Sequence, residues 1–321
     1  MNALRTAGAT ALVIALLGTA AATVAWKGSA AEPGTGGLRL TQPGTLLVVD
    51  AEDTRVHQKT RQGEELGTGP DCRRAAVAAG TLACLHGLPG PFSSEVRIYR
   101  PGRTEPEVTL PVWGKPSRAR VSPSGHLVAW TVFRSGDSYA ASGQFSTTAG
   151  IYDLRNGAHY GSLEDFTVHV DDQAAQSDDR NFWGVTFAAD DRTFYATMSV
   201  GGRTHLMRGD LSTRELTALR TNVECPSLSP DETRIAYKKR VGADWQLHVL
   251  HLQTGQDTAL AAPAGIDDQA AWLDDATIAY SRAERGRPFV YAVPADGSGQ
   301  PVTLTEGSSP TLTTDARRPT P

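Results

Sequence analysis

Residues 226–237 read PSLSPDETRIAY and residues 269–280 read QAAWLDDATIAY. Both stretches contain an apolar strand, a turn rich in Asp or Pro, and a second apolar strand, a pattern typical of a β-hairpin. Three weaker copies have the same order: ARVSPSGHLVAW at 119–130, GVTFAADDRTFYA at 184–196 and RRAAVAAGTLACL at 73–85. The sequence therefore contains an internal repeat.

The length of the repeat indicates the architecture. The second strands of the five copies align with spacings of 46, 66, 41 and 43 residues, on Leu82, Val128, Phe194, Ile235 and Ile278. Three of these spacings match a propeller blade of about 40–50 residues. Each copy continues into a third strand, at 96–101, 150–157, 206–213, 247–255 and 290–299. One four-stranded sheet cannot hide both of its faces, so the sheets are expected to stack around an axis.

The two ends of the repeat region predict a sixth blade. Residues 44–60, GTLLVVDAEDTRVHQKT, are interpreted as the third and fourth strands of a blade, and residues 308–314, SSPTLTT, as its first strand. The predicted fold is all-β: a β-propeller of six four-stranded blades, with one blade closed by both termini. A seventh blade is the alternative if residues 38–71 hold further strands.

These motifs also carry a family resemblance. SPSG at 122–125 and SPDE at 229–232, with the third strands that follow, resemble the WD-like repeats of TolB-type propellers over about residues 72–311. Through RNFWGVTFA at 180–188 and ECPSLSPDETRIAYKK at 224–239, the chain is similar to the secreted or membrane-anchored TolB-like proteins of actinobacteria. No segment predicts the separate N-terminal α/β domain of TolB, so the resemblance implies neither a role in a TolB–Pal system nor an outer-membrane partner.

The N-terminal segment predicts export. Ala7 to Trp26 are 20 residues without a charge, flanked by Arg5 and Lys27, and about 20 apolar residues span the ~30 Å hydrocarbon layer of a membrane. The segment also fits a signal peptide cleaved after Ala31. The predicted organisation is a signal peptide or membrane anchor at 1–31, a tether at 32–37, a propeller at 38–314 and a disordered tail at 315–321. Both alternatives place the propeller outside the cytoplasm, either membrane-anchored or secreted.

Composition and motifs exclude several function classes. Lys and Arg number 31 against 35 Asp and Glu, a net charge of −4, so there is no basic field for nucleic acid. The sequence has no HExxH zinc motif, GxSxG elbow, P-loop or dinucleotide fingerprint, and we expect no cofactor and no metal. The stretch DDQAAQSDDR at 171–180 has clustered carboxylates, for which a calcium site is the alternative to a solvated loop.

Three cysteines lie in the part of the chain expected to be exported. Cys72 and Cys84 flank a predicted hairpin, and disulfides persist in oxidising compartments. We therefore expect a Cys72–Cys84 disulfide, with two buried thiols as the alternative. Cys225 is expected to be unpaired and packed at the start of an inner strand.

The residues that precede the inner strands are candidates for a binding site. In a propeller these positions surround the mouth of the central channel, where convergent polar groups beside aromatic rings favour ligand or peptide binding. They are Arg73, Arg118, Asn181, Glu224 and Asp268, with Trp183 and Trp272 within the strands. The alternative is that they satisfy one another and bind channel water.

A second candidate surface comes from the one long repeat. Its extra length lies at 133–150 and 168–181, and long loops on a rigid scaffold often carry recognition. Tyr139, Phe145 and Phe182 are the expected aromatic anchors; loops without a partner are the alternative.

Two functions follow from these observations. The first is a monomeric, non-catalytic propeller that binds a protein or peptide of the cell envelope. The alternative is a propeller-based hydrolase or lyase, which needs two carboxylates held about 5–10 Å apart across a bond; the candidates are Asp179, Glu224 and Asp268.

Overall fold

The computed structural model describes residues 37–136, 139, 145–171, 173–174, 177–266 and 268–314. The predicted anchor or signal segment at 1–31, the tether up to residue 36 and the tail at 315–321 lie outside the described residues. Among the residues that are described, no helix has the length and apolarity needed to cross a membrane.

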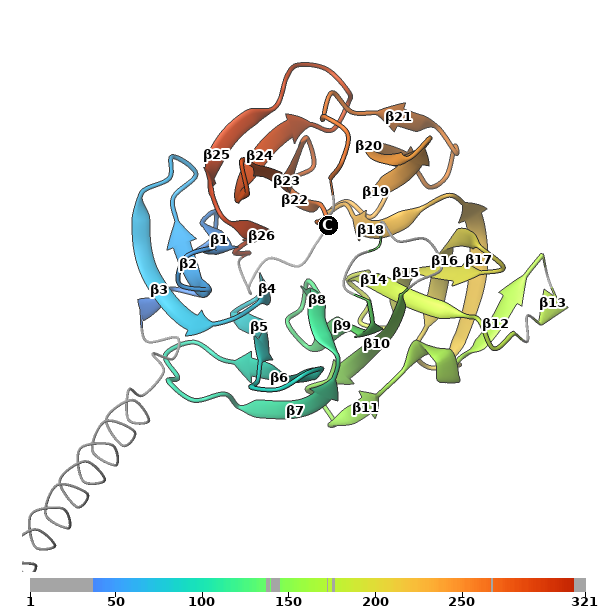
Figure 1. Cartoon of the computed structure of the whole chain (residues 1–321), viewed down its shortest axis with the longest axis horizontal. Helices are drawn as coiled ribbons and strands as arrows, with labels where there is room; N and C mark the ends of the chain where they lie inside the picture. The colour runs from blue at the N-terminus through green and yellow to red at the C-terminus, as the bar shows by residue number, and fades with distance from the viewer. Residues whose placement is uncertain are drawn as a thin grey trace, which may run out of the picture. The chain divides into compact units, whose positions relative to one another are not determined.

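The chain forms a ring of six β-sheets, each built on four antiparallel strands (Figure 1). This confirms the predicted six-bladed propeller. From the innermost strand outward, blade 1 contains β26 (Ser308–Leu312), β1 (Leu46–Val49), β2 (Arg55–Lys59) and β3 (Glu65–Asp71). Blade 2 contains β4 (Arg74–Ala78), β5 (Thr81–Gly87), β6 (Ser93–Tyr99) and β7 (Val108–Trp113). Blade 3 contains β8 (Lys115–Val121), β9 (Leu127–Ser135), β10 (Ser146–Asp153) and β11 (Ala158–Tyr160).

The other three blades follow in chain order. Blade 4 contains β14 (Asn181–Phe187), β15 (Thr193–Val200), β16 (Arg203–Asp210) and β17 (Glu215–Thr221). Blade 5 contains β18 (Glu224–Leu228), β19 (Arg234–Val241), β20 (Asp244–His251) and β21 (Asp257–Ala259). Blade 6 contains β22 (Ala271–Asp274), β23 (Thr277–Glu284), β24 (Arg287–Pro294) and β25 (Val302–Glu306).

Blade 4 has two additional strands at its outer edge. The long second repeat forms a 3₁₀ turn, η2 (Leu163–Asp165), and then β12 (Thr167–Val170) and β13 (Gln173–Ala174). β12 pairs in parallel with β17, so the sheet has six strands. The extra residues, which lie in the sequence between blades 3 and 4, therefore extend the outer edge of blade 4.

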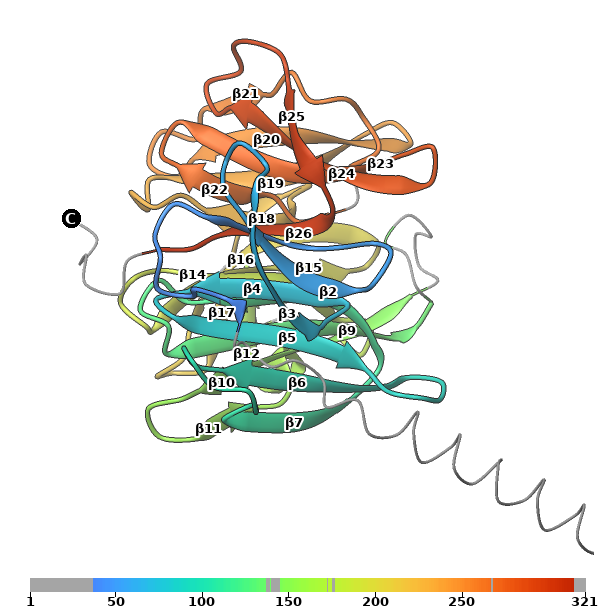
Figure 2. The same cartoon turned by 90° about the vertical axis from the view of Figure 1, so that its left-hand side faces the viewer.

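Blade 1 closes the ring with both ends of the propeller, as predicted. β26 pairs with β1, and Figures 1 and 2 show this red strand beside the blue strands of blade 1. Residues 44–60 were predicted to form the third and fourth strands of this blade, and this prediction is wrong. They form β1 and β2, the second and third strands, and β3 is the fourth. β3 reads ELGTGPD and pairs with β2 through two register shifts, so it lacks the apolar alternation that would mark it as a strand.

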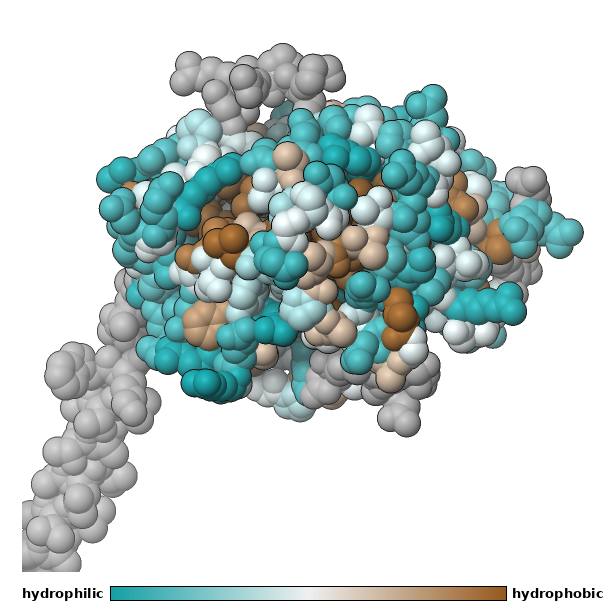
Figure 3. Space-filling view, turned by 90° about the horizontal axis from the view of Figure 1, so that it is seen from above, coloured by the Kyte–Doolittle hydropathy of each residue, from teal (hydrophilic) through white to brown (hydrophobic). Residues whose placement is uncertain are grey.

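The core explains why the second strands gave the clearest repeat signal. β5, β9 and β15 are buried on both faces, because each lies inside its blade and is covered by the neighbouring blades. The outer strand β7 alternates between half-buried and exposed positions. Seen from above, the edge of the ring is hydrophilic around its outside, and apolar residues gather toward its middle (Figure 3).

The turns between first and second strands share a backbone requirement. Gly125, Asp191 and Glu232 occupy equivalent positions and have φ values of 78°, 50° and 57°. Asp190 accepts hydrogen bonds from the backbone N–H groups of Arg192 and Thr193. Aspartate favours such turns because its side chain bonds nearby backbone amides, and Asp190 does so here.

The cysteines behave as predicted. Cys72 and Cys84 form a disulfide with their Cα atoms 5.3 Å apart, and Cys225 is free and buried. Cys72 follows the last strand of blade 1 and Cys84 lies in β5 of blade 2, so the disulfide links two blades at the closure of the ring.

Candidate functional site

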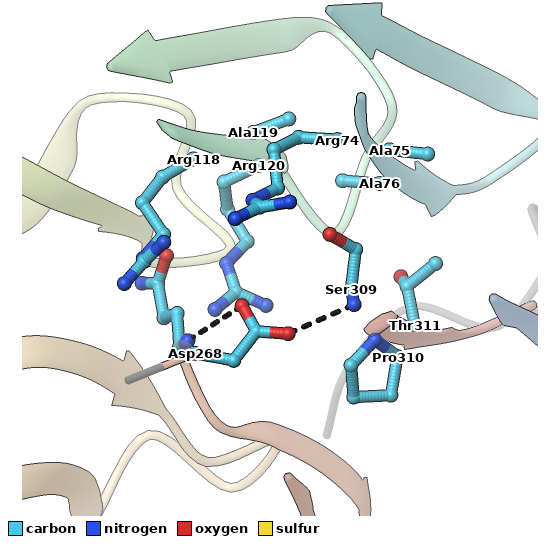
Figure 4. Close-up of a pocket in the computed structure, with 11 residues that line it drawn as sticks. Arg74, Ala75, Ala76, Arg118, Ala119, Arg120, Asp268, Ser309, Pro310 and Thr311 are labelled. Atoms are coloured by element: carbon cyan, nitrogen blue, oxygen red, sulfur yellow. Dashed lines mark hydrogen bonds between the residues drawn. The ribbon is translucent and has the colours of Figure 1, made fainter. Parts of the chain in front are cut away.

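The described residues line two separate hollows, a small pocket in the central channel and a larger groove. The channel pocket has a volume of about 20 Å³. It is lined from four blades by Arg74 of β4, Arg118 and Arg120 of β8, Asp268 before β22, and Ser309 of β26 (Figure 4). The innermost strands bring these residues together from positions up to 235 apart in the sequence.

Arg120 spans the channel. Its Nη2 atom donates to the carbonyl oxygen of Ala270, 3.1 Å away, and to Oγ of Ser227 at 3.4 Å. The side chain thus connects blade 3 with blades 5 and 6. Burial lowers the pKa of this guanidinium to about 10, although the negative charge of Asp268 opposes that effect.

Asp268 is held as an anion in the same pocket. Burial by itself would raise the pKa of this carboxyl group, but the positive charges of Arg118 and Arg74 outweigh it and the pKa lies below its usual range. Its Oδ2 accepts hydrogen bonds from Oγ of Ser281 at 2.7 Å and from the backbone N–H of Ser309 at 2.8 Å. Asp268 is therefore a fixed negative charge in the channel at neutral pH.

The groove has a volume of about 1110 Å³ and lies over blades 3, 4 and 5. It is on the face where the innermost strands begin, because it is lined by the first residues of β14 and β18 and the last residues of β15, β17 and β19. Four arginines and four carboxylates line it: Arg134, Arg180, Arg203, Arg240, Glu164, Asp178, Asp179 and Glu224. The walls therefore carry both signs of charge.

Aromatic side chains form one end of the groove. The ring centroids of Tyr139 and Phe145 lie 5.3 and 5.4 Å from that of Trp183. Tyr139 and Trp183 are each 1% exposed, whereas Phe145 is half-buried. Phe145 is thus the member of this cluster with surface left for a partner to cover.

Two cations pack on the ring of Trp245 beside the groove residues Glu224 and Arg240. Nζ of Lys238 lies 4.2 Å from the centroid of Trp245, and the guanidinium of Arg240 lies 4.0 Å from it. Nε1 of Trp245 donates to Oε1 of Glu224 at 2.9 Å. Cation–π contacts of this kind are strongest when water is excluded, and Lys238 is only 1% exposed.

The predicted site residues divide between these two hollows. The groove contains Tyr139, Phe145, Asn181, Trp183, Glu224 and Asp179. The channel pocket contains Arg118 and Asp268. The polar residues expected to form one ring around the channel mouth are therefore divided between two hollows.

Three predicted residues line neither hollow. Arg73 is exposed before β4, and Phe182 is 1% exposed within the core of blades 3 and 4. Nε1 of Trp272 donates to the carbonyl oxygen of Ser227 at 2.8 Å, which joins blade 6 to blade 5. Phe182 therefore packs in the core, because the side chain of the second residue in β14 points away from the groove.

Asn181 supports the alternative that some of these polar groups satisfy one another. Its Oδ1 accepts hydrogen bonds from the backbone N–H and the hydroxyl of Thr147, at 2.8 and 2.6 Å. This side chain joins blade 4 to blade 3 at the edge of the groove.

Sequence reasoning missed Arg74, Arg120 and Ser309. Arg120 is two residues after Arg118 in β8 and therefore points to the same side of the strand, a signal that the sequence did contain. Ser309 reaches the pocket only because β26 closes the ring, which no local pattern shows.

The three candidate carboxylates of the hydrolase alternative do not share one site. Asp179 and Glu224 line the groove, whereas Asp268 lies in the channel pocket. Hydrogen bonds from Oγ of Ser177 and the backbone N–H of Gly201 lower the pKa of Asp179. A general acid needs a raised pKa, so neither Asp179 nor Asp268 is prepared for that role.

The stretch at 171–180 supplies no metal site in the part of the chain that the structure describes. Within those residues, no group of three or more His, Cys, Asp or Glu side chains could hold a metal ion. Asp179 instead bonds to Ser177 and Gly201.

No protein-family model matches this sequence, and no curated protein matches it. The fold does have solved neighbours. TolB from Acinetobacter baumannii superposes with a TM-score of 0.58 at 16% identity, over 84% of this chain and 66% of that chain. A putative TolB from Agrobacterium tumefaciens gives 0.50 at 10% identity, over 83% and 91%.

The structural neighbours include TolB proteins. This confirms the TolB-like propeller that the repeat motifs predicted. A chain from a nidogen/laminin complex also matches, with a TM-score of 0.51 at 10% identity over 84% of this chain and 98% of that chain. At such identities the likeness concerns the fold, and this chain spans slightly less than two thirds of the Acinetobacter protein. The actinobacterial type stays a prediction.

Proposed function

We propose that this TolB-like propeller is an exported protein-interaction module that binds a peptide segment of an envelope protein in the groove over blades 3 to 5. The observation that carries the proposal is the groove itself, with about 1110 Å³ of space, charged walls and an aromatic end. Binding sites are typically concave, and peptide anchors are often aromatic.

The groove walls favour a partner that carries both charges. Nη2 of Arg134 donates to Oε1 of Glu164 at 3.1 Å, and both side chains are partly exposed. Arg203 and Asp178 are exposed on the rim. Charged groups at a rim increase the association rate and the specificity more than the affinity, so the affinity should come mainly from the aromatic end.

Phe145 is the expected centre of binding. Its neighbours Tyr139 and Trp183 are buried and hold it in place through edge-to-face contacts. A partner that covers the rest of Phe145 removes its apolar surface from water without rearranging the cluster. Alanine replacement of such an aromatic anchor typically costs ~2 kcal/mol or more.

Export is supported by the disulfide and by the N-terminal sequence. Disulfides are rare in reducing compartments, and the Cys72–Cys84 bond lies in a chain that starts with an apolar segment of signal or anchor type. We propose an extracytoplasmic location, either secreted or anchored, for a monomer. Mass spectrometry of the mature N-terminus separates the two: a chain that starts after Ala31 is secreted, and an intact chain is anchored.

The decisive experiment is affinity capture from the native envelope with the full-length protein and two variants. Phe145→Ala should reduce recovery of a partner at least tenfold. Trp113→Ala is the matched control, because this aromatic residue is 63% exposed and lies in blade 2, outside the groove. The proposal fails if no partner is recovered reproducibly, or if the Phe145→Ala protein retains its partner as well as the control does.

A further inference from the structure

Blade 2 has an apolar loop that its hairpin does not need. The connection from β5 to β6 is residues 88–92, LPGPF, and none of them is charged. In blades 4, 5 and 6 the equivalent connections are only residues 201–202, 242–243 and 285–286. Residues 89–91 are exposed, whereas Leu88 and Phe92 are half-buried. The extra residues of blade 2 are therefore presented to the surroundings of the propeller.

An exposed tryptophan extends this apolar surface. Trp113, the last residue of β7, is 63% exposed, and its ring centroid lies 5.3 Å from that of Phe92. The backbone N–H of Gly114 donates to the carbonyl oxygen of Phe92 at 2.7 Å, which fixes the loop beside the end of β7. Larger apolar groups on the surface of a monomer mark interaction sites. Residues 88–92 and Trp113, here called the blade 2 patch, therefore indicate a contact surface.

Basic side chains border the blade 2 patch. Nζ of Lys115 lies 5.7 Å from the ring centroid of Phe92. Arg73 is exposed, and its Cγ would lie 3.6 Å from a Cβ added at Gly87, the residue before the loop. Residues 87–94 and 111–119 contain no Asp or Glu. The two segments that form the patch and its border thus offer positive charge to a negatively charged surface.

These features together fit the surface of a lipid bilayer. Tryptophan is enriched at the membrane–water interface, and Lys and Arg extend from apolar surroundings to the headgroups. Pro89 and Pro91 have no backbone N–H, and that of Leu88 already donates to the carbonyl oxygen of Ser93 at 2.9 Å. The loop therefore loses few hydrogen bonds with water when it enters the headgroup region.

The start of the propeller is compatible with this contact. Gly37 lies against β3 of blade 1, since a Cβ added there would lie 2.7 Å from the carbonyl oxygen of Thr68. Blade 1 precedes blade 2 in the ring, and the disulfide links them. Residues 27–36 separate Gly37 from the uncharged segment 7–26, and a chain of that length spans at most ~35 Å. An anchor at 7–26 therefore keeps blade 1 within that distance of the bilayer.

We propose that the blade 2 patch contacts the surface of an anionic lipid bilayer. Phe92 and Trp113 lie at the level of the headgroups, and Arg73 and Lys115 pair with lipid phosphates. This inference goes beyond the protein-interaction proposal and rests only on its extracytoplasmic location. The groove over blades 3 to 5 is separate from the patch, so Trp113→Ala stays a control for capture of a protein from a detergent extract, in which no bilayer is present.

The test measures quenching of Trp113 by brominated lipids, because bromine quenches an indole only at short range. The full-length protein is reconstituted into vesicles of equal parts phosphatidylglycerol and phosphatidylcholine, with or without bromine on the acyl chains. The emission of the parent minus that of Trp113→Phe reports Trp113 alone. Most of this difference should be lost in the brominated vesicles.

Variants identify the residues responsible, each compared with its own Trp113→Phe counterpart. Phe92→Ser should restore the emission of Trp113. Arg73→Gln combined with Lys115→Gln should shift half-maximal quenching to a higher fraction of phosphatidylglycerol. Val302→Ser is the matched control, because Val302 is also 63% exposed but lies in blade 6, and it should leave the quenching unchanged.

Three results overturn the proposal. The first is emission from Trp113 that brominated vesicles do not quench, which would assign the patch to a protein partner. The second is full quenching after Phe92→Ser, and the third is an unshifted lipid dependence after removal of both basic side chains. Phe145→Ala should leave the quenching intact, so failure of the groove proposal and failure of this one are distinguishable.

Discussion

A cluster of polar side chains around Asp257 should stabilise blade 5, and its removal is the most informative stability test. Oδ1 of Asp257 accepts hydrogen bonds from the hydroxyl of Tyr237 at 3.0 Å and pairs with Nδ1 of His248 at 2.9 Å. Oδ2 accepts from Nζ of Lys239 at 2.6 Å. The carboxylate of Asp257 in the outer strand β21 thus bonds to side chains of both β19 and β20.

The magnitude follows from what Asp257→Ala leaves behind. Tyr237 is 1% exposed and His248 is 7% exposed, so both would lose a partner in a buried setting. Each unsatisfied group costs ~1–3 kcal/mol, and water that enters at the outer strand recovers part of this. We expect a loss of about 3 kcal/mol, which lowers the melting temperature of a domain this size by roughly 6–10 °C.

The network also predicts a pH dependence. Burial would raise the pKa of Asp257, but hydrogen bonds from Lys239, His248 and Tyr237 outweigh it and hold the pKa below its usual range. Since the folded pKa is depressed, the stabilisation is present above the unfolded pKa of ~3.9. It is lost as the pH falls through the folded pKa.

The assay is urea unfolding followed by circular dichroism, at pH 7 and at intervals down to pH 3. Glu52→Gln is the control, since Glu52 has a side chain 76% exposed and an exposed charge of this kind contributes little. The reasoning is refuted if Asp257→Ala unfolds at the same urea concentration as the control, or if the variant keeps the acid sensitivity of the parent.

Three further tests address the closure, the contact between β14 and β18, and the turns. Replacing Cys72 and Cys84 with serine should lower the unfolding free energy by about 3 kcal/mol, and unaltered urea unfolding would show that the disulfide adds nothing to closure. Gly184→Ala should destabilise the protein by ~2–3 kcal/mol, because Gly184 has a φ of 66° and an added Cβ would lie 2.8 Å from the backbone of β18. The control Gly201→Ala, where the space around the residue is open, should cost only about 1 kcal/mol. Burial would raise the pKa of Asp231, but hydrogen bonds outweigh it and lower the pKa to about 2. The contribution of Asp231 to the unfolding free energy should therefore fade from about pH 4 to pH 2, and Asp231→Asn should make the measured fall of the unfolding free energy with pH shallower.

The fold was predictable because its strongest signal is local. Second strands such as β19 and β23 have consecutive buried residues and follow turns rich in Asp, and this combination recurs at blade spacing. β3 was missed because its ELGTGPD sequence has little apolar character. Its place at the outer edge of blade 1 comes from pairing with β2, not from its own pattern.

The candidate sites were predictable only in part, because each is assembled across blades. Alignment of the repeats placed Arg118, Glu224 and Asp268 in one ring at the channel mouth, whereas the structure places Glu224 in the groove. It could not show that Arg120 spans the channel to Ala270, since that contact depends on the radius of the ring. Phe182 was predicted as an anchor from its position beside a long loop, but the direction of its side chain depends on where β14 begins.

The location of the groove follows from where the chain has extra residues. The hairpins of blades 4 and 5 supply part of the groove wall, including Arg203 and Arg240. The long second repeat supplies Tyr139 and Phe145 on one side and Asp178 to Arg180 on the other. The closure in blade 1 and the disulfide to blade 2 lie on the other half of the ring from these loops. The loops that line the groove are therefore separate from the strand pairing that closes the propeller.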